Sequence, residues 1–374
     1  MAEERYSLKD ALFNAEKVAY LGQQFGAADA RFDAAGFERD VMAEMLPLEL
    51  KARMDLIARV LAQYLPDDFH AAADVIEAAL PEPLDPTKTD DDFGDFIFGP
   101  LGTFVQNQGI AHFTRSMALL KEITKRFSME YAIRPFLNAY PDQTRAELAE
   151  WAFDENYHVR RLVSEGTRPK LPWGMKIGLD VRDAIPFLDT LHSDKTRYVT
   201  RSVANHLNDI AKTDPALVIE TLRRWRVQGE QGAKELDWIT RHALRTLIKQ
   251  GHPDAMELLG YGPDPAIEVG AVVLGAKHVA IGDVLAFDVE IVARDAAKLL
   301  VDYAVEFVKA DGSRKPKVFK LKQVALKAGE RVVLKKRHRF KGDATTFRLY
   351  PGTTRIVLQI NGVARSEATF DLIE

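Results

Sequence analysis

"HVRRLVSEG" (158–166) is followed 40 residues later by "YVTRSVANHLND" (198–209) and after another 40 by "WITRHALRTLIKQG" (238–251). The three segments align without gaps. Branched apolar residues and arginines recur at the matching positions Val159, Val199 and Ile239, and Arg161, Arg201 and Arg241. Asp154 and Asp194 precede the first two segments at the same offset. The chain therefore contains an internal repeat whose pattern of apolar residues is typical of a helix.

The length of the repeat predicts a particular architecture. A period of 40 residues lies in the range of HEAT-type repeats, whose helix pairs stack into a curved solenoid. Helical spacing also runs through earlier segments such as "ELKARMDLIARVLAQYL" (49–65). The Pro- and Asp-rich "LPEPLDPTKTDDDFGD" (80–95) interrupts the helices as a long connection. We expect a mainly α protein with a HEAT-like solenoid over residues 1–265.

The pattern of residue types along the chain changes at Ile267. The segments that follow are β-branched and alternating, and Gly282-Asp283, Asp311-Gly312 and Asn361-Gly362 mark turns between them. About seven short strands of this kind are typical of a β-sandwich. We expect an all-β, immunoglobulin-like domain over residues 266–374, with "GYGPDPA" (260–266) as the joint.

Composition narrows the class of protein. The chain has 374 residues, which favours two domains, and it has no cysteine, which excludes disulfides and thiolate metal sites. The nine histidines show no ligand-like pair, so neither a metal nor a cofactor is expected. The charged N-terminus lacks an apolar signal core, and no run of 18 apolar residues follows. These features predict a cytoplasmic protein without a membrane segment.

The net charge of −4 hides an uneven distribution along the chain. Residues 1–100 hold 21 acids and 9 bases, whereas residues 268–374 hold 19 bases and 13 acids. An acidic end and a basic end on one chain favour polyanion binding by the C-terminal part.

The repeated arginines have two readings. If the inner helices line a concave face, Arg161, Arg201 and Arg241 form a stripe that binds phosphate groups. Arginine at a repeat position also commonly pairs with a carboxylate of the neighbouring repeat, and the pattern alone favours this pairing.

Three segments carry candidate chemistry: "MEYAIRPFL" (129–137), "HVRRLVSEGTRPKLPW" (158–173) and "SVANHLNDIAKTDP" (202–215). The first places Glu130 and Arg134 four residues apart, on a helix face expected to end at Pro135. The second places Glu165 at a helix C-terminus, against the macrodipole, with Gly166 as the expected cap.

These acidic residues would meet if the inner helices are stacked neighbours. Glu130, Glu165 and Asp209 then converge on one part of the concave surface. Taken singly, each is more commonly an ion-pair partner, and Trp173 is more commonly a core residue.

Together the segments resemble the AlkC-type alkylpurine DNA glycosylases of the HEAT-like AlkC/AlkD superfamily. The resemblance rests on "EYAIRPFL", "DENYHVRRLVSEGTRPKLPW" and "SVANHLNDIAKTDP", and extends to "ITRHALRTLIKQGHP" and to the C-terminal "KPKVFKLKQVAL" and "QINGVA". It covers nearly the whole chain, including the immunoglobulin-like domain found in a subset of the family. Lys170 stands where arginine is expected and Thr167 where a small residue is usual, and both departures are mild.

The resemblance implies hydrolytic excision of cationic N-alkylated bases, principally 3-methyladenine, from double-stranded DNA, which leaves an abasic site. The residues implied for the active site are Glu130, Glu165, Asp209 and Trp173. Those implied for DNA binding are Arg134, Arg160, Arg161, Arg168, Lys170, Arg201, Asn205, Asn208 and Arg241. The family is associated with bending the duplex and reaching the lesion in place, so the sandwich is expected to act as a DNA clamp. A monomer is expected, nucleoid-associated when it is bound to DNA.

Two other functions stay open at this point. A HEAT-repeat scaffold without enzymatic activity would bind a protein through its concave face, and a DNA-binding paralogue would recognise damage without cutting. Release of a base from methylated DNA separates both from a glycosylase.

Overall fold

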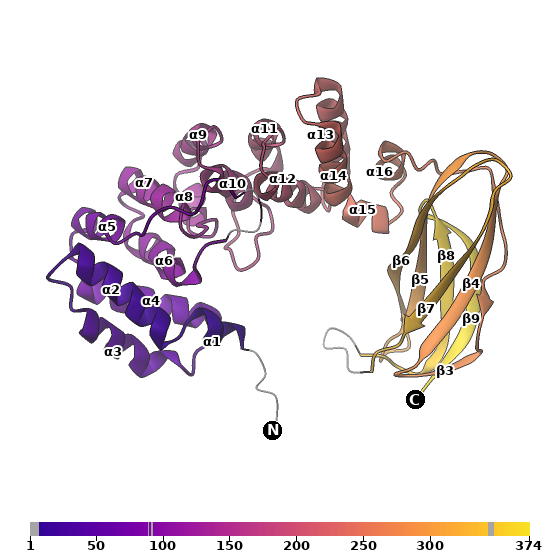
Figure 1. The fold of residues 1–374 in the computed structure, drawn as a ribbon, viewed down its shortest axis with the longest axis horizontal. Coiled ribbons are helices and arrows are strands. Elements are labelled where there is room, and N and C mark those ends of the chain that lie inside the picture. The colour runs from indigo at the N-terminus through magenta and orange to yellow at the C-terminus, as the bar shows by residue number, and fades with distance from the viewer. Residues whose placement is uncertain (1–6, 89, 91–92, 343–347) are drawn as a thin grey trace. The chain divides into compact units, whose positions relative to one another are not determined.

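The structure, a computed structural model, describes residues 7–88, 90, 93–342 and 348–374. A helical region extends from Leu8 to Leu258, and a β-sheet domain follows from Ile267 to Ile373 (Figure 1). The chain forms two compact units. Unit 1 comprises Met1–Thr213 and Trp225–Ala243, and unit 2 comprises Asp214–Arg224 and Leu244–Glu374. None of the helices described is long and apolar enough to cross a membrane.

The first half of the helical region consists of α1 (Leu8–Leu12), α2 (Ala15–Ala28), α3 (Ala34–Met45), α4 (Leu50–Tyr64), α5 (Phe69–Ala78), η1 (Phe96–Phe98), α6 (Gly99–Gln108) and α7 (Phe113–Thr124). The second half consists of α8 (Arg134–Ala139), α9 (Pro141–Trp151), α10 (Tyr157–Gly166), α11 (Val181–Leu191), α12 (Arg197–Ile210), α13 (Pro215–Gln228), α14 (Ala233–Ala243), α15 (Arg245–Lys249) and α16 (Pro253–Leu258).

Many of these helices start at a residue whose side chain caps the first turn. The side chains of Asn14, Asp33 and Asp68 each accept a hydrogen bond from a backbone N–H at the start of α2, α3 and α5. Asn156 and Asp180 do the same for α10 and α11. Such caps satisfy backbone donors that have no partner inside the helix.

The repeated segments fall on α10, α12 and α14, and α12 packs against the other two. Val159, Val199 and Ile239 are fully buried, so the recurring apolar position lies in the core of the helical region. The recurring arginines differ from one another. Arg161 is buried, whereas the side chain of Arg241 is 56% exposed.

The β-sheet domain contains β1 (Ile267–Val269), β2 (Val273–Leu274), β3 (His278–Ala280), β4 (Val284–Ala293), β5 (Ala297–Val308), β6 (Arg314–Leu326), β7 (Arg331–Arg339), β8 (Gly352–Ile360) and β9 (Val363–Ile373). One sheet has the order β1-β4-β2, with β7 paired to β4, and the other has the order β3-β9-β8-β5-β6. Phe287 and Ile291 of β4 share one apolar core with Tyr303 of β5 and Leu358 of β8, so the two sheets form a sandwich.

The predicted turns lie between strands as expected. Gly282, Gly312 and Gly362 all have positive φ, as does Asn361, with φ 49°. Glycine and asparagine adopt positive φ more easily than other residues, which explains why these pairs occur at the turns between strands. The described strands number nine rather than about seven, because the short β1, β2 and β3 add to the longer strands.

The last helices belong to the same unit as the sandwich. Met256, Leu259 and Tyr261 pack against Leu300 of β5. The Asn361 side chain donates to the carbonyl oxygen of Gly262 over 2.7 Å and accepts from the backbone N–H of Leu300 over 2.8 Å. The joint between helices and strands is therefore ordered by contacts on both sides. The domain division after residue 265 stays a prediction.

Candidate active site

Helix α10 supplies the first acidic residue of the candidate site. It runs through Gly166 without a left-handed cap, since Thr167, the residue after it, has φ −91°. A Cβ at Gly166 would lie 2.3 Å from Cδ1 of Ile133, so glycine is required here for close packing and not for the expected cap. This contact brings the last turn of α10, with Glu165, against the segment that carries Glu130.

Arg161 links Glu130 to Glu165. Its Nη1 lies 3.4 Å from Oε2 of Glu130, and its Nη2 lies 3.8 Å from Oε2 of Glu165. Its guanidinium also lies 4.7 Å from the centre of the Tyr198 ring and donates to the hydroxyl of Ser128. Burial lowers the pKa of Arg161, but the two glutamates outweigh burial and hold that pKa above its usual value. Arg161 is therefore a fixed cation inside the site.

Arg168 bridges Glu165 and Asp209. Its Nε and Nη2 donate to Oδ2 of Asp209 over 2.9 and 2.8 Å, and its Nη1 donates to Oε1 of Glu165. Both carboxylates are 5% exposed. The guanidinium therefore holds two acids from α10 and α12 in one buried cluster, although the acids are 44 positions apart in the sequence.

Glu165 stays ionised in spite of its burial. Burial raises its pKa, but Arg161 and Arg168 lower it more, and the net shift is downward. The hydroxyl of Ser202 on α12 also donates to Oε2 of Glu165 over 2.6 Å, which favours the charged form. The arginines also offset the unfavourable placement of a carboxylate at a helix C-terminus.

Asp209 has a second cationic partner. Nζ of Lys212 donates to its Oδ1 over 2.8 Å, while Arg168 occupies Oδ2. Every carboxylate oxygen of Glu165 and Asp209 thus accepts a hydrogen bond, as buried charges require.

Glu130 and Trp173 line an open pocket of about 820 Å³. Glu130 precedes helix α8, whose first turn contains Pro135, so this proline begins the helix and does not end it as expected. Trp173 lies in the loop after α10 with φ 64°, and it is 70% exposed, not a core residue. Neither Glu165 nor Asp209 is among the described residues that line this pocket.

The four residues implied for catalysis therefore form two groups joined by Arg161. Glu165 and Asp209 form a buried ion-pair cluster with Arg168, whereas Glu130 and Trp173 face the pocket. The contact between Arg161 and Glu130 connects the groups.

Arg134 holds the loop that carries Trp173. It is 1% exposed and donates to the carbonyl oxygens of Gly166, Arg168 and Met175 over 2.8, 2.9 and 2.5 Å. Burial, assisted by repulsion from Arg168, lowers the pKa of Arg134 to about 10. This geometry corrects the expectation that Arg134 contacts DNA, because its donors are directed to backbone oxygens of its own chain.

The other residues implied for DNA binding differ in their access to a ligand. Arg168 is directed to Glu165 and Asp209, and Asn208 is buried, so neither presents its polar groups to a phosphate. Arg160 pairs with Asp194 of the next repeat over 2.5 Å. This is the kind of pairing between neighbouring repeats that is common for arginines in such proteins.

Four further candidates are more accessible. Lys170 is exposed in the loop after α10. Arg201 pairs with Asp90, and Arg241 lies 3.9 Å from Asp237. The side-chain oxygen of Asn205 lies 2.9 Å from Nε2 of His242.

Sequence reasoning missed several residues of the site. Ser202 is a small polar residue at a buried position of α12, and Ser164 of α10 lies 2.9 Å from it, hydroxyl to hydroxyl. Phe93 lies in the Pro- and Asp-rich segment whose composition predicts only a long connection, yet it lines the pocket and contacts the ring of Tyr198. Within the described ranges, no group of three or more His, Cys, Asp or Glu side chains is arranged to hold a metal ion.

The comparisons with known proteins agree with one another. A family model described as a DNA alkylation repair enzyme matches residues 124–247, which include all three acidic residues. A second model, described as the C-terminal Ig-like domain of the uncharacterised protein YhaZ, matches residues 268–374. The uncharacterized protein YhaZ of Bacillus subtilis (strain 168) is 32% identical over 365 residues, which is 96% of this chain and 98% of that protein.

A solved structure extends the match to the entire fold. The Pseudomonas fluorescens alkylpurine DNA glycosylase AlkC, bound to DNA containing an abasic site analog, is 33% identical with a TM-score of 0.88. The alignment covers 99% of this chain and 100% of that one. The resemblance identified from the sequence motifs is confirmed, and the chain belongs to the AlkC-type family of alkylpurine DNA glycosylases that carry a C-terminal immunoglobulin-like domain.

Proposed function

We propose that this protein is a monofunctional glycosylase that hydrolyses the N-glycosidic bond of cationic N-alkylated bases, principally 3-methyladenine, in double-stranded DNA. The observation that carries the proposal is the pair of buried carboxylates, Glu165 and Asp209, which both accept hydrogen bonds from the guanidinium of Arg168. The similarity to a glycosylase bound to DNA supports the choice of partner. Release of free methylated base from duplex DNA tests it.

Cleavage of this glycosidic bond requires negative charge near the sugar more than it requires a general acid to protonate the base. An N3-alkylated adenine is already a cation, so the electron pair of the N9–C1′ bond moves to the base, which leaves neutral. Positive charge then develops on the sugar as an oxocarbenium ion. Carboxylates placed in advance near that charge stabilise the transition state.

A water molecule completes the hydrolysis. Its oxygen bonds to C1′, and its proton passes to a carboxylate acting as base, a step typically worth about 10²–10⁴-fold in rate. Glu130 has the access for this role, because its side chain is 21% exposed and faces the pocket. Arg161 and Arg168 keep Glu165 charged, and their ion pairs hold all three acids in position before DNA arrives.

The helical region supplies a scaffold for the duplex. We propose that α10, α12 and α14 are inner helices of a HEAT-like solenoid, which acts as a monomer in the cytoplasm. The accessible Lys170, Arg201 and Arg241 are our candidates for contacts with DNA phosphates, in keeping with the phosphate reading of the repeat.

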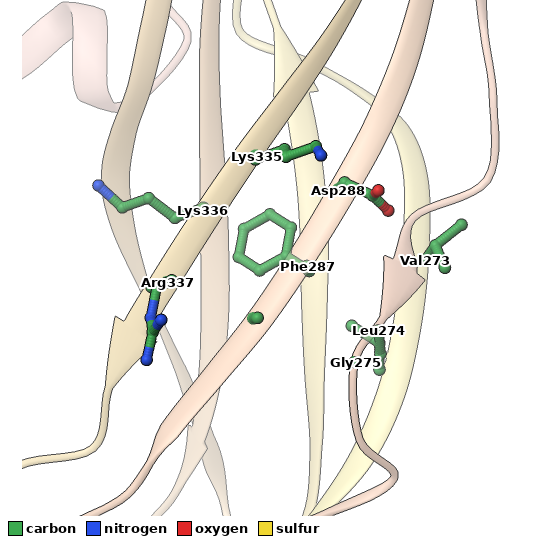
Figure 2. Close-up of a pocket in the computed structure, with 9 residues that line it drawn as sticks. Val273, Leu274, Gly275, Phe287, Asp288, Lys335, Lys336 and Arg337 are labelled. Carbon is green, nitrogen blue, oxygen red and sulfur yellow. The ribbon is translucent and has the colours of Figure 1, made fainter.

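The sandwich adds a second basic surface. Residues 313–341 contain twelve bases and one acid. They form β6 and β7, which contact each other and lie at the edges of their sheets. Figure 2 shows Lys335, Lys336 and Arg337 of β7 around a shallow pocket that also includes Asp288 of β4. We propose that this edge contacts the DNA backbone as the expected clamp.

Neutralising two exposed charges on β7 is expected to weaken DNA binding and its salt dependence. Lys335→Ala with Arg337→Ala removes at most two phosphate contacts, so the slope of log affinity against log salt should become shallower by up to about 1.8. The control is Lys277→Ala with Arg294→Ala, which removes the same charge from exposed sites outside β6 and β7. Equal slopes for both pairs would show that β7 does not contact the backbone. Removal of the whole sandwich is a poorer test, because it would expose Met256 and Leu259.

The product is expected to be an intact strand with an abasic site that breaks only in alkali. Strand cleavage by a glycosylase generally needs a neutral amine that forms a Schiff base with the sugar. Nζ of Lys212 forms an ion pair with Asp209 over 2.8 Å, while Lys170 is exposed. Lys51 lines the pocket and is the further amine to consider. Borohydride trapping of a protein–DNA adduct would contradict simple hydrolysis, and loss of that adduct in Lys51→Met would identify the amine.

A further inference from the structure

The last turn of α10 carries Glu165, and side chains from elsewhere in the fold satisfy its carbonyl oxygens. The last four carbonyl groups of an α-helix have no partner inside the helix. In α10 three of them accept hydrogen bonds from side chains: Val163 from Thr167, Ser164 from His206 and Gly166 from Arg134, over 2.6, 3.0 and 2.8 Å. Of these donors, His206 belongs to α12, the helix that also carries Asp209. His206 therefore ties the turn that bears one acid to the helix that bears the other.

His206 donates to this carbonyl group as a neutral imidazole. A carbonyl oxygen only accepts hydrogen bonds, so Nδ1 of His206 carries a proton. The side chain is fully buried, and its Nε2 has no hydrogen-bond partner within the described ranges of the chain. Burial lowers the pKa of His206 to about 4, and repulsion from Arg168 acts in the same direction. At neutral pH the ring is therefore uncharged, with its one proton on the nitrogen that faces α10.

Ser202 holds the same turn of α10 through its hydroxyl group. It lies four positions before His206, so the two side chains are neighbours on one face of α12. The Ser202 hydroxyl donates to Oε2 of Glu165 over 2.6 Å and lies 2.9 Å from the hydroxyl of Ser164. Because the carboxylate only accepts and Ser202 has one hydroxyl proton, Ser164 is the donor to Ser202. Ser164 is thus held twice, by its carbonyl oxygen and by its hydroxyl, directly before Glu165.

We propose that His206 is a positioning residue for the reaction, which fixes the last turn of α10 so that the Glu165 carboxylate keeps its contact with Ser202. The inference rests on the proposed function, because His206 acts through one of the acids of the site. His206 is fully buried and reaches Glu165 only by way of Ser164. A displacement of about 1 Å in a reacting group can cost about 10²-fold in rate. Loss of this hydrogen bond should therefore affect the chemical step more than the binding of DNA.

Two substitutions of nearly equal shape test this hydrogen bond in the full chain. In His206→Asn the amide nitrogen can take the place of Nδ1, whereas in His206→Leu a methyl group stands there and no donor is left. We expect single-turnover base release to be about 10- to 10²-fold slower in His206→Leu than in His206→Asn. The two variants should bind duplex DNA with the same affinity. Both lack the imidazole ring, so their difference reports the hydrogen bond and not the lost volume.

His192 provides a matched control. It is also fully buried, and its Nδ1 lies 2.7 Å from the carbonyl oxygen of Asp189 in α11, outside the acidic cluster. His192→Leu and His192→Asn should release base at equal rates. Melting temperatures show that each variant is folded at the temperature of the assay. A second measurement needs no substitution, since the nitrogen chemical shifts of the unaltered chain labelled with ¹⁵N-histidine should include a ring protonated on Nδ1 and not on Nε2.

The outcomes separate the role of His206 from the proposed function. Equal release by His206→Leu and His206→Asn, or the same difference between the two variants at position 192, would overturn the positioning role and leave the glycosylase function standing. A chain in which every histidine is protonated on Nε2 alone would overturn it as well. No base release by the unaltered chain would overturn the proposed function and this role with it, while a ring protonated on Nδ1 would still show that the contact exists.

Discussion

Glu165→Gln is expected to reduce base release by on the order of 10²–10⁴-fold, the range associated with loss of a preorganised electrostatic group or a general base. The amide keeps the shape of the side chain and can still accept a hydrogen bond from Ser202, but it removes the negative charge. Arg161 and Arg168 are then left with only Glu130 and Asp209 as acidic partners. Single-turnover release of methylated base measures the effect.

The same substitution is also expected to lower the melting temperature. Glu165 is a buried ion-pair partner of Arg168, and breaking such a pair commonly costs about 3–5 kcal/mol when one charge is left unpaired. The position of Glu165 against the helix macrodipole alone would make its charge dispensable for stability, but the buried ion pair makes the charge stabilising. Asp194→Asn is the matched control, because Asp194 is a buried partner of Arg160 outside the acidic cluster. If Asp194→Asn lowers stability and base release as much as Glu165→Gln does, Glu165 is structural only.

Arg168→Gln is expected to move the acid limb of the pH–rate profile to higher pH. Burial raises the pKa of Glu165, and Arg161 and Arg168 together hold the net value below the ordinary range. Without Arg168 the effect of burial is opposed only by Arg161 and Ser202 among the causes given above, so the carboxylate protonates at a higher pH. Activity lost at acidic pH should then be partly recovered as the pH is raised. A profile that falls equally at every pH would show that Arg168 acts through shape and not through charge.

The lowered pKa of Glu165 also affects the stability of the unaltered protein. The pKa of Glu165 in the folded state lies below its unfolded value. Its contribution to the free energy of unfolding is therefore present above the unfolded pKa and is lost as the pH falls through the folded pKa. Stability should consequently decrease on acidification below the ordinary glutamate range, and Glu165→Gln should flatten this part of the curve. Thermal melts at a series of pH values measure it.

Much of the fold follows from patterns that need no tertiary information. The recurring Val159, Val199 and Ile239 predict helices that pack against one another, and all three are fully buried. The turn pairs Asp311-Gly312 and Asn361-Gly362 predict strand boundaries, because positive φ restricts the choice of residue. Short strands such as β2, with two residues, carry no periodicity, which explains why about seven strands are expected where nine are described.

The candidate site was only partly predictable. Spacing places Glu165 and Asp209 on successive repeat helices, but it does not say which cation lies between them. Arg168 follows α10 in a loop that reads as basic and exposed, and only the fold turns it inward to both acids. Arg134 illustrates the same limit, since its three carbonyl partners, at the end of α10 and in the loop after it, are more than 30 positions away. Long-range pairing of this kind leaves no local signal in one sequence.

The most direct test of the glycosylase assignment is incubation of the purified chain with duplex DNA treated with a methylating agent, followed by chromatography of the released bases. The account predicts free 3-methyladenine from the unaltered protein, strands that remain intact until alkali is added, and little or no release by Glu165→Gln. Tight binding to the methylated duplex with no free methylated base would contradict it, and would show a protein that recognises damage without cutting.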